Sequence, residues 1–540
     1  METGSKKKYS YWKLKGNKHD DFQLSGRYLS TGIQRSQFLM KKNIIANVFG
    51  RLWGLISSFL FIPLYIKFLG FESYSVISFT LMIAGIMAVL DGGLTATLSR
   101  EFARTDNTDD EKLRIYRTLE TVYFAVVLIS MALVVVFSGL IANSLNVKSF
   151  SHDQLAKFLK IVSVDIGFQL LLRFYMGGLL GLEKQVKANA YQILWGIVRN
   201  AVAVVVIYFY PSLFYFFLWQ SISTVIFTLL LKIELDKQIF HDHKFSIKPK
   251  FEKSVFREVR KFAGGMMLIS IIAALNTQMD KMTISKLLSI ESLGYYTLAV
   301  SLATALIVVV NPIATAILPK FTSLYSGKSY EEAKELFNTY NVVSSILIFS
   351  ILAIFIFFSK DLLWLWTGNL KLAENAYKIV PIISIAYALI AMQVIPYHVA
   401  IANGYTRLNN ILGISSIALT VPGYIYGIKN YGVFGAAVVF MVMQLITLLI
   451  YIYFINKKFI GELFIKSIFI KQILLPLFSA LLTAFSLSIL FKDIGNDNRI
   501  SLFTIIAFSS LITLAITMLV NLPKKFSAQV KNMAEKIIRR

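Results

Sequence analysis

The residues of this sequence best suited to do chemistry are charged side chains inside long apolar segments. Arg199 is the clearest example, because it lies near the centre of the apolar stretch 187–209. A charge at bilayer depth costs at least about 2.5–3.5 kcal/mol on insertion scales, so such side chains face a bundle interior or an aqueous cavity. Guanidinium and ammonium groups bind phosphates and carboxylates. The pattern therefore indicates a polar cavity with cations that attract an anionic ligand.

Five residues are the candidates for substrate contact in this cavity. They are Asn47, Arg51, Arg173, Arg199 and Lys281. Each has a structural alternative. Arg51 lies near a segment end, where it can extend to lipid headgroups. Arg173 follows Asp165 on the same helix face, so the two can neutralise each other, and Lys281 lies near the interface.

Two acidic residues are candidates for ion coupling. Asp91 opens a Gly-Gly step, and Asp280 precedes Lys281 near the end of an apolar segment. The sequence has no cysteine and five histidines, none of them spaced as a helical metal pair. We therefore expect no metal, no cofactor and no thiol catalysis. As a separate expectation, the chain is not an enzyme. No Gly-Lys loop for ATP is present either.

The elements that must position these residues follow from composition. Hydrophobic residues make up 56% of the 540-residue chain and charged residues 16%, against about 25% charged in soluble domains. The mean hydropathy is +0.64. A chain of this kind needs lipid as its solvent, and we expect an all-α, polytopic membrane protein.

About fourteen segments are long and apolar enough to span a bilayer, which takes about 20 residues. They lie at 43–69, 74–99, 117–143, 155–182, 187–209, 211–233, 259–286, 292–318, 337–359, 376–402, 408–428, 432–456, 470–491 and 499–521. With the N-terminus inside, most of the 55 Lys and Arg residues fall in inner segments. This distribution predicts that both termini are cytoplasmic, and it explains the net charge of +25 without nucleic acid.

An internal repeat predicts the domain organisation. Residues 67–79 and 286–298 share Lys, Leu, Glu and Ser at a constant offset of 219 residues. We therefore predict two six-helix bundles in a pseudo-twofold arrangement plus two C-terminal helices. The expected boundaries are a basic, disordered extension at 1–39, a first lobe at 40–233, a linker at 234–258, a second lobe at 259–456, and two further helices with a basic tail at 457–540.

Four stretches carry a resemblance to a known superfamily. They are NVFGRLWGLISSFLFIPLYIKFLGFESYS (47–75), LDGGLTATLSREFAR (90–104), DKMTISKLLSIESLGYYTLA (280–299) and YGVFGAAVVF (431–440). In order and spacing the sequence resembles the polysaccharide and O-antigen flippases of the multidrug/oligosaccharidyl-lipid/polysaccharide (MOP) exporter superfamily. Ser75 departs from the pattern, because the family usually has Gly there, as the second half does at Gly294.

The resemblance implies a flippase of the bacterial inner membrane. Its substrate would be an undecaprenyl-diphosphate-linked oligosaccharide, moved between leaflets by alternating access. Membrane lipids and other polysaccharide-assembly proteins are the expected partners. Two alternatives stay open: a drug or cation antiporter of the same superfamily, and a membrane-embedded polymerase or glycosyltransferase. The second alternative needs a large outer loop with an acid/base cluster, and the loops at 144–154 and 360–375 are short.

Overall fold

The fold was analysed in a computed structural model, which describes residues 59–104, 106–239, 251–492 and 498–522 together with Trp53, Ile56 and Ser57. The extension at 1–39, with the alternative start at Met40, lies outside the described residues. The labelled elements are the helices α2 (Phe71–Met87), η1 (Ala88–Asp91), α3 (Leu94–Ala103), α4 (Asp109–Ser144), α5 (His152–Gly181), α6 (Gln185–Phe209), α7 (Leu213–Ile239), α8 (Lys253–Leu287), α9 (Ile290–Ala303), α10 (Ala305–Ser326), α11 (Tyr330–Phe357), α12 (Ser359–Thr367), α13 (Leu370–Ala376), α14 (Ile379–Ala402), α15 (Arg407–Ile455), η2 (Asn456–Ile460), η3 (Phe464–Leu474), α16 (Leu475–Leu490) and α17 (Arg499–Asn521). The helix Phe59–Leu69 precedes them. The all-α prediction is confirmed.

Within the described residues, ten helices are long and apolar enough to cross a membrane, or eleven if the bent pair Lys253–Arg260 and Ala263–Leu287 is one span. One of the ten, Arg407–Ile460, contains two helices that meet at Gly432, whose φ of 59° interrupts the helix. The first expected segment, 43–69, is described only in part. A multi-pass membrane protein is confirmed, and the count of fourteen stays a prediction.

Capping residues in the sequence mark where two of the long helices begin. Thr108 accepts a hydrogen bond from the backbone N–H of Glu111, whose side chain returns to the Thr108 N–H, and this capping box starts α4. Ser151 and Gln154 form the same arrangement at the start of α5. Such caps satisfy N–H groups that a helix start leaves without partners. They fix where α4 and α5 enter the bundle.

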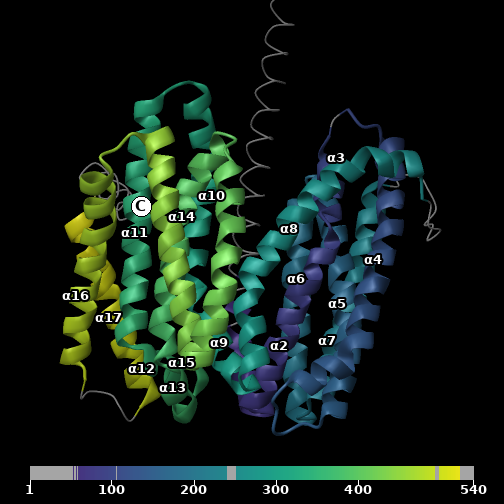
Figure 1. Cartoon of the computed structure of the whole chain (residues 1–540), viewed down its shortest axis with the longest axis horizontal. Helices are drawn as coiled ribbons and strands as arrows, with labels where there is room; N and C mark the ends of the chain where they lie inside the picture. The colour runs from purple at the N-terminus through teal and green to yellow at the C-terminus, as the bar shows by residue number, and fades with distance from the viewer. Residues whose placement is uncertain are drawn as a thin grey trace, which may run out of the picture.

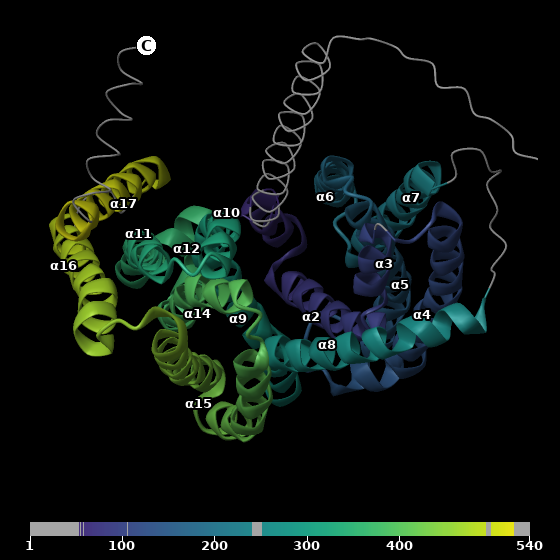
Figure 2. The ribbon, with the colours of Figure 1, turned by 90° about the horizontal axis from the view of Figure 1, so that it is seen from above.

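The helices form two groups. Figure 1 shows α2–α7 on one side and α9–α17 on the other, and Figure 2 shows α8 running from the first group to the second. The ribbons lie close together around α2 and α9 and diverge toward the end that carries α3 and the start of α8. We call these the narrow end and the wide end. The residue limits predicted for the two lobes and the linker are not decided by this arrangement and stay a prediction.

Contacts between the groups close the narrow end. The backbone N–H of Ile290 donates to the carbonyl of Asn146 at 3.2 Å. The rings of Phe71 and Tyr295 lie 4.5 Å apart, and the indole N–H of Trp366 donates to the Phe59 carbonyl at 2.7 Å. One apolar core runs through both groups here, whereas a second core joins α3, α4, α5 and α7 to the start of α8. The first turns of α8 therefore pack with the first group.

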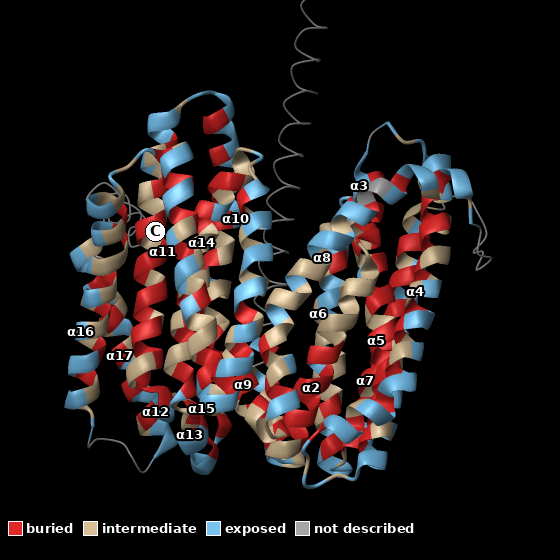
Figure 3. Ribbon diagram, viewed as in Figure 1, coloured by how far each residue is buried: buried red, intermediate tan, exposed pale blue. Residues whose placement is uncertain are grey.

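The outward faces of the helices remain apolar. Figure 3 shows buried residues concentrated inside each group and exposed residues on the outer helix faces. Leu128, Val136 and Leu140 of α4 and Leu519 of α17 are exposed, Leu519 by 85%. Apolar side chains on a continuous outer band are expected where lipid tails surround the protein.

Candidate functional site

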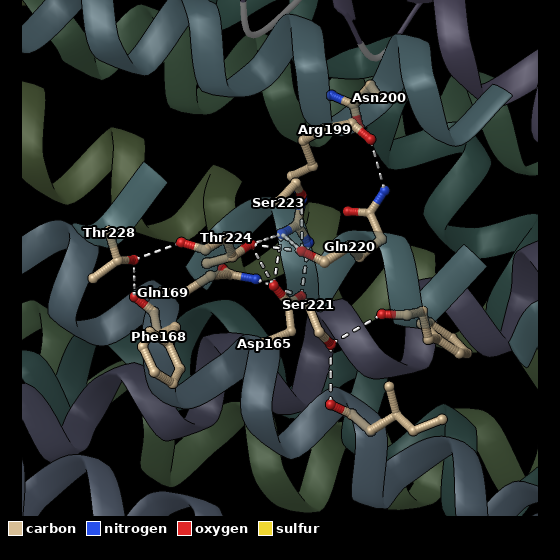
Figure 4. A network of polar contacts seen from close by, with 12 residues as sticks. Asp165, Phe168, Gln169, Arg199, Asn200, Gln220, Ser221, Ser223, Thr224 and Thr228 are labelled. Carbon is tan, nitrogen blue, oxygen red and sulfur yellow. Dashed lines mark hydrogen bonds and ion pairs between the residues drawn. The ribbon is translucent and has the colours of Figure 1, made fainter. Parts of the chain in front are cut away.

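An ion pair inside the first group joins Arg199 on α6 to Asp165 on α5. Nη1 donates to Oδ1 at 2.6 Å, and Nη2 donates to Oδ2 at 2.8 Å, so the pair is bidentate. Figure 4 shows this pair with the side chains around it. Thr224 donates to Asp165 Oδ1 at 2.7 Å and also accepts from Arg199, while Gln169 donates to Oδ2 at 2.9 Å. Both charges are thus neutralised and hydrogen-bonded.

The expected pairing of Arg173 with Asp165 is wrong. Arg199 takes the Asp165 carboxylate because it approaches from the neighbouring helix with both guanidinium nitrogens, a geometry that favours a bidentate pair. Arg173 lies two turns further along α5, and its side chain is exposed. It forms no ion pair within the described ranges. The sequence therefore singled out Asp165, Arg173 and Arg199, but Asp165 pairs with Arg199 and not with Arg173.

A cavity of about 320 Å³ lies between the two groups. Tyr65 and Asn200 line it from the first group, and Lys281 lines it from α8. A smaller cavity of about 100 Å³ shares Tyr65 and Asn200 and reaches Arg199, Asp165 and Gln169. The polar face of α5 and α6 therefore adjoins the space between the groups.

Hydrogen bonds hold the lining of this cavity in place. Tyr65 donates to Asn200 Oδ1 at 3.0 Å, and Asn200 Nδ2 donates to the Ser57 hydroxyl at 3.0 Å. Lys281 Nζ donates to the carbonyl of Thr277 at 2.8 Å and to Gln278 Oε1 at 3.3 Å. Neither acceptor is charged. Lys281 and Arg173 are thus cations that no carboxylate of the described chain neutralises.

The two candidate coupling residues have similar surroundings. Asp91 accepts from the Tyr123 hydroxyl at 2.7 Å, from the Gly93 N–H at 3.2 Å and from Thr95. Asp280 is buried and accepts from the Tyr296 hydroxyl at 2.7 Å. Each carboxylate thus has hydroxyl donors, and neither forms an ion pair within the described residues. No cluster of three or more metal-ligating side chains occurs in the part of the chain that was searched.

Two predicted site residues, Asn47 and Arg51, lie outside the described residues. Sequence reasoning also missed a buried ionic cluster. Lys232 on α7 contacts Glu120 on α4 at 2.5 Å and Asp236 at 3.4 Å, and Tyr116 donates to Asp236 at 2.8 Å. Lys232 falls at the last turn of the predicted segment 211–233 and Asp236 in the predicted linker 234–258, so neither was recognised as a residue inside the helix bundle. Their spacing of one helix turn was the signal that could have identified them.

Two family models and a curated relative match this chain. A family model described as polysaccharide biosynthesis protein matches residues 40–325, and the MatE model matches residues 266–425. A putative O-antigen transporter of Shigella flexneri is 20% identical over 401 residues, which are 74% of this chain and 93% of that protein.

Two solved structures share the fold. The lipid II flippase MurJ in an inward closed conformation is 17% identical, with a TM-score of 0.69 over 88% of this chain and 97% of MurJ. An inward-facing multidrug resistance transporter of the MATE family, also of the MOP superfamily, is 11% identical, with a TM-score of 0.59 over 76% and 95% of the two chains. The resemblance stated from the sequence motifs is confirmed: the chain belongs to the polysaccharide biosynthesis protein family of the MOP superfamily.

Proposed function

We propose that this protein is a flippase that moves an undecaprenyl-diphosphate-linked oligosaccharide across the bacterial inner membrane by alternating access. A single observation carries the proposal. The cavity between the two helix groups is closed at one end and is lined by Lys281, which pairs with no carboxylate of the described residues. A diphosphate brought from water into such a cavity needs positive charge to compensate for lost hydration. The named substrates of the relatives, O-antigen and lipid II, support the same class of substrate.

The charge distribution supports one orientation. The wide end carries the described parts of three basic connections, at 100–104, 106–117, 232–239, 251–261 and 320–334, and the positive-inside rule favours a cytoplasmic place for them. In this orientation the cavity opens to the cytoplasm, where lipid-linked precursors are made, and the closed narrow end faces outward. Both termini are then cytoplasmic. In the proposed cycle, this conformation would be the one that receives substrate.

The cations take different roles. Arg173 and Lys281 attract the diphosphate, because no carboxylate of the described chain competes for them. Arg199 is held by Asp165, so its task is to keep the polar wall formed by α5 and α6 in place. Arg51 and Asn47 are proposed to extend the same site. Asp91 and Asp280, with hydroxyl donors and no cation partner, are the proposed sites of coupling to protons or sodium.

A drug or cation antiporter is the second candidate. The match of the MatE model to residues 266–425 favours it. The two functions differ in ligand charge: an antiporter of cationic drugs would place carboxylates at the cavity wall, whereas the described wall presents Lys281. The anionic substrate is therefore the proposal tested first.

A vesicle assay tests the proposed function. The purified protein would be reconstituted with fluorescent undecaprenyl-diphosphate glycan, and transfer between leaflets would be measured by quenching with a membrane-impermeant reagent. We expect transfer with the wild type, a strong loss with Arg173→Ala or Lys281→Ala, and partial activity with Arg173→Lys. The exposed Lys371→Ala at the narrow end is the control. Equal transfer by all variants would remove the cationic site, and drug-driven cation exchange without glycan transfer would establish the antiporter.

A further inference from the structure

A second cavity is lined by α8 and helices of the second group and shares no lining residue with the cavity between the groups. It has a volume of about 400 Å³ and is enclosed by α8, α10, α14 and the two arms of α15 on either side of Gly432. Small-molecule sites commonly have volumes of about 300–1,000 Å³. No role in the proposed diphosphate site uses this cavity.

The chemistry of its wall is unusual for the interior of a membrane protein. Amide side chains reach it from every side, as Asn276, Asn311, Gln393, Asn409 and Gln444. The rings of Tyr397, Tyr424, Tyr451 and His398 line it as well, and no Asp, Glu, Lys or Arg is among the described residues of the wall. A site with so many neutral donors and acceptors matches an uncharged ligand rich in hydroxyl groups.

Several of these polar groups lack partners in the protein. The side chains of Asn311 and Gln444 are half-buried and form no hydrogen bond within the described residues, and the half-buried Asn409 side chain faces the Tyr451 hydroxyl. The Tyr451 hydroxyl is buried and has no partner of normal geometry there, although Asn409 is next to it. A buried polar group without a partner costs about 1–3 kcal/mol. Among the described lining residues only the Tyr451 hydroxyl is such a group, and the half-buried amides of Asn311, Asn409 and Gln444 add donors and acceptors around it, so a ligand with hydroxyl groups can complete their hydrogen bonds.

Asn276 is an amide in the same wall whose hydrogen bonds are structural. Asn276 Nδ2 donates to the carbonyls of Ile272 and Gly413 at 2.9 and 3.0 Å, and its Oδ1 accepts from Ser416 at 2.6 Å. Its hydrogen bonds hold α8 against α15. The amides of Asn311, Asn409 and Gln444 hold nothing comparable.

We infer that this cavity binds uncharged sugar rings of the lipid-linked glycan. Amides offer both donors and acceptors to ring hydroxyls, and the tyrosine rings pack against the apolar faces of the sugars. An acidic sugar is disfavoured, because its charge would be buried without a counter-ion. Lipid tails are excluded as ligands by the same polar groups. The inference rests on the proposed function and adds that the glycan, besides the diphosphate, is recognised by the second helix group.

A binding comparison tests the inference separately from the proposed function. The probes are undecaprenyl diphosphate and the lipid-linked glycan that accumulates in cells lacking this protein, each titrated into the purified full-length chain. We expect the wild type to bind the glycan-bearing lipid at least tenfold more tightly. Tyr451→Phe and Gln444→Met should each reduce this gain by about two- to tenfold without changing the affinity for undecaprenyl diphosphate.

The controls separate the sites. Tyr451→Phe removes a buried hydroxyl that lacks a partner, so it should fold at least as well as the wild type. Thr315→Val removes a hydroxyl from α10 outside the cavity, and both affinities should remain unchanged. Arg173→Ala should weaken both ligands equally. The sugar site would be overturned if the wild type bound both lipids equally tightly. It would also be overturned if the cavity variants kept the full preference for the glycan-bearing lipid. If the wild type bound neither lipid, the proposed function would be overturned and the sugar site with it.

Discussion

Ser75 on α2 packs directly against Gly294 on α9, and the two residues occupy equivalent positions of the internal repeat. A Cβ atom built on Gly294 would lie 2.0 Å from the Ser75 hydroxyl oxygen and 3.0 Å from Phe71. Sequence comparison of the two halves had treated the Ser/Gly difference as a departure from the family pattern. In the structure the two positions face each other at the narrow end, so at least one of them must lack a side chain.

A side chain at Gly294 should therefore disturb closure of the narrow end. We expect Gly294→Leu to insert normally but to lose most of its glycan export, because its side chain separates α2 from α9. Export per membrane-inserted molecule is the measurement. Ser75→Gly removes the only atom that crowds Gly294 by less than 3.0 Å, so it should remain active. Full export by Gly294→Leu would show that this contact is not needed.

A cysteine pair should lock the narrow end. Asn146 and Ser289 form an isolated bridge between the helix groups. Backbones paired in this way lie about 4.8 Å apart, within the range of about 4.4–6.8 Å that a disulfide spans. The chain has no native cysteine, so Asn146→Cys/Ser289→Cys can form only the intended bond within one molecule. Export should stop on oxidation and return with dithiothreitol, while each single variant stays active under both conditions.

The helical architecture was predictable because each spanning segment is long and apolar, which lipid requires of any spanning helix. The break near Gly432 was predictable for the same reason, since the apolar stretch from 408 to 456 is too long for a single span. Arg199 and Asp165 were identified as important because a charge in an apolar segment needs a partner. Their pairing was not predictable, because it depends on how α5 and α6 are rotated against each other.

The neutral cavity in the second group was missed for a physical reason. Asn, Gln and Tyr are common in membrane helices and cost far less than charges, so Asn311, Asn409 and Gln444 do not stand out along the chain. Only packing brings them from three different helix segments to one space. Lys232 was missed for the opposite reason, since its place beside a basic loop made it look solvated.

Surface labelling should decide the orientation. Asn107 lies between α3 and α4 at the wide end, and Lys371 lies on α13 at the narrow end. With the wide end in the cytoplasm, Lys371→Cys should react with an impermeant maleimide on intact cells, and Asn107→Cys should react only after permeabilisation. The reverse pattern would place the cavity opening outside the cell and contradict the proposed entry of substrate.

Substitutions at Arg199 and Asp165 can separate a structural role of the pair from a role in holding the substrate. If the pair is structural, Arg199→Ala leaves a buried carboxylate alone, which costs about 3–5 kcal/mol. We expect Arg199→Ala and Asp165→Ala to lower the amount of folded protein and its melting temperature. The double variant Asp165→Asn/Arg199→Gln removes both charges while keeping hydrogen-bonding groups, so it should recover most of the folded protein. Recovery of export by the double variant would show that the Arg199 charge is not needed to hold the substrate, because Lys281 would still line the cavity and Arg173 would still be present. Normal folding of Arg199→Ala with export abolished would instead assign the charge to the substrate, and would require Asp165 to exchange Arg199 for another partner during transport.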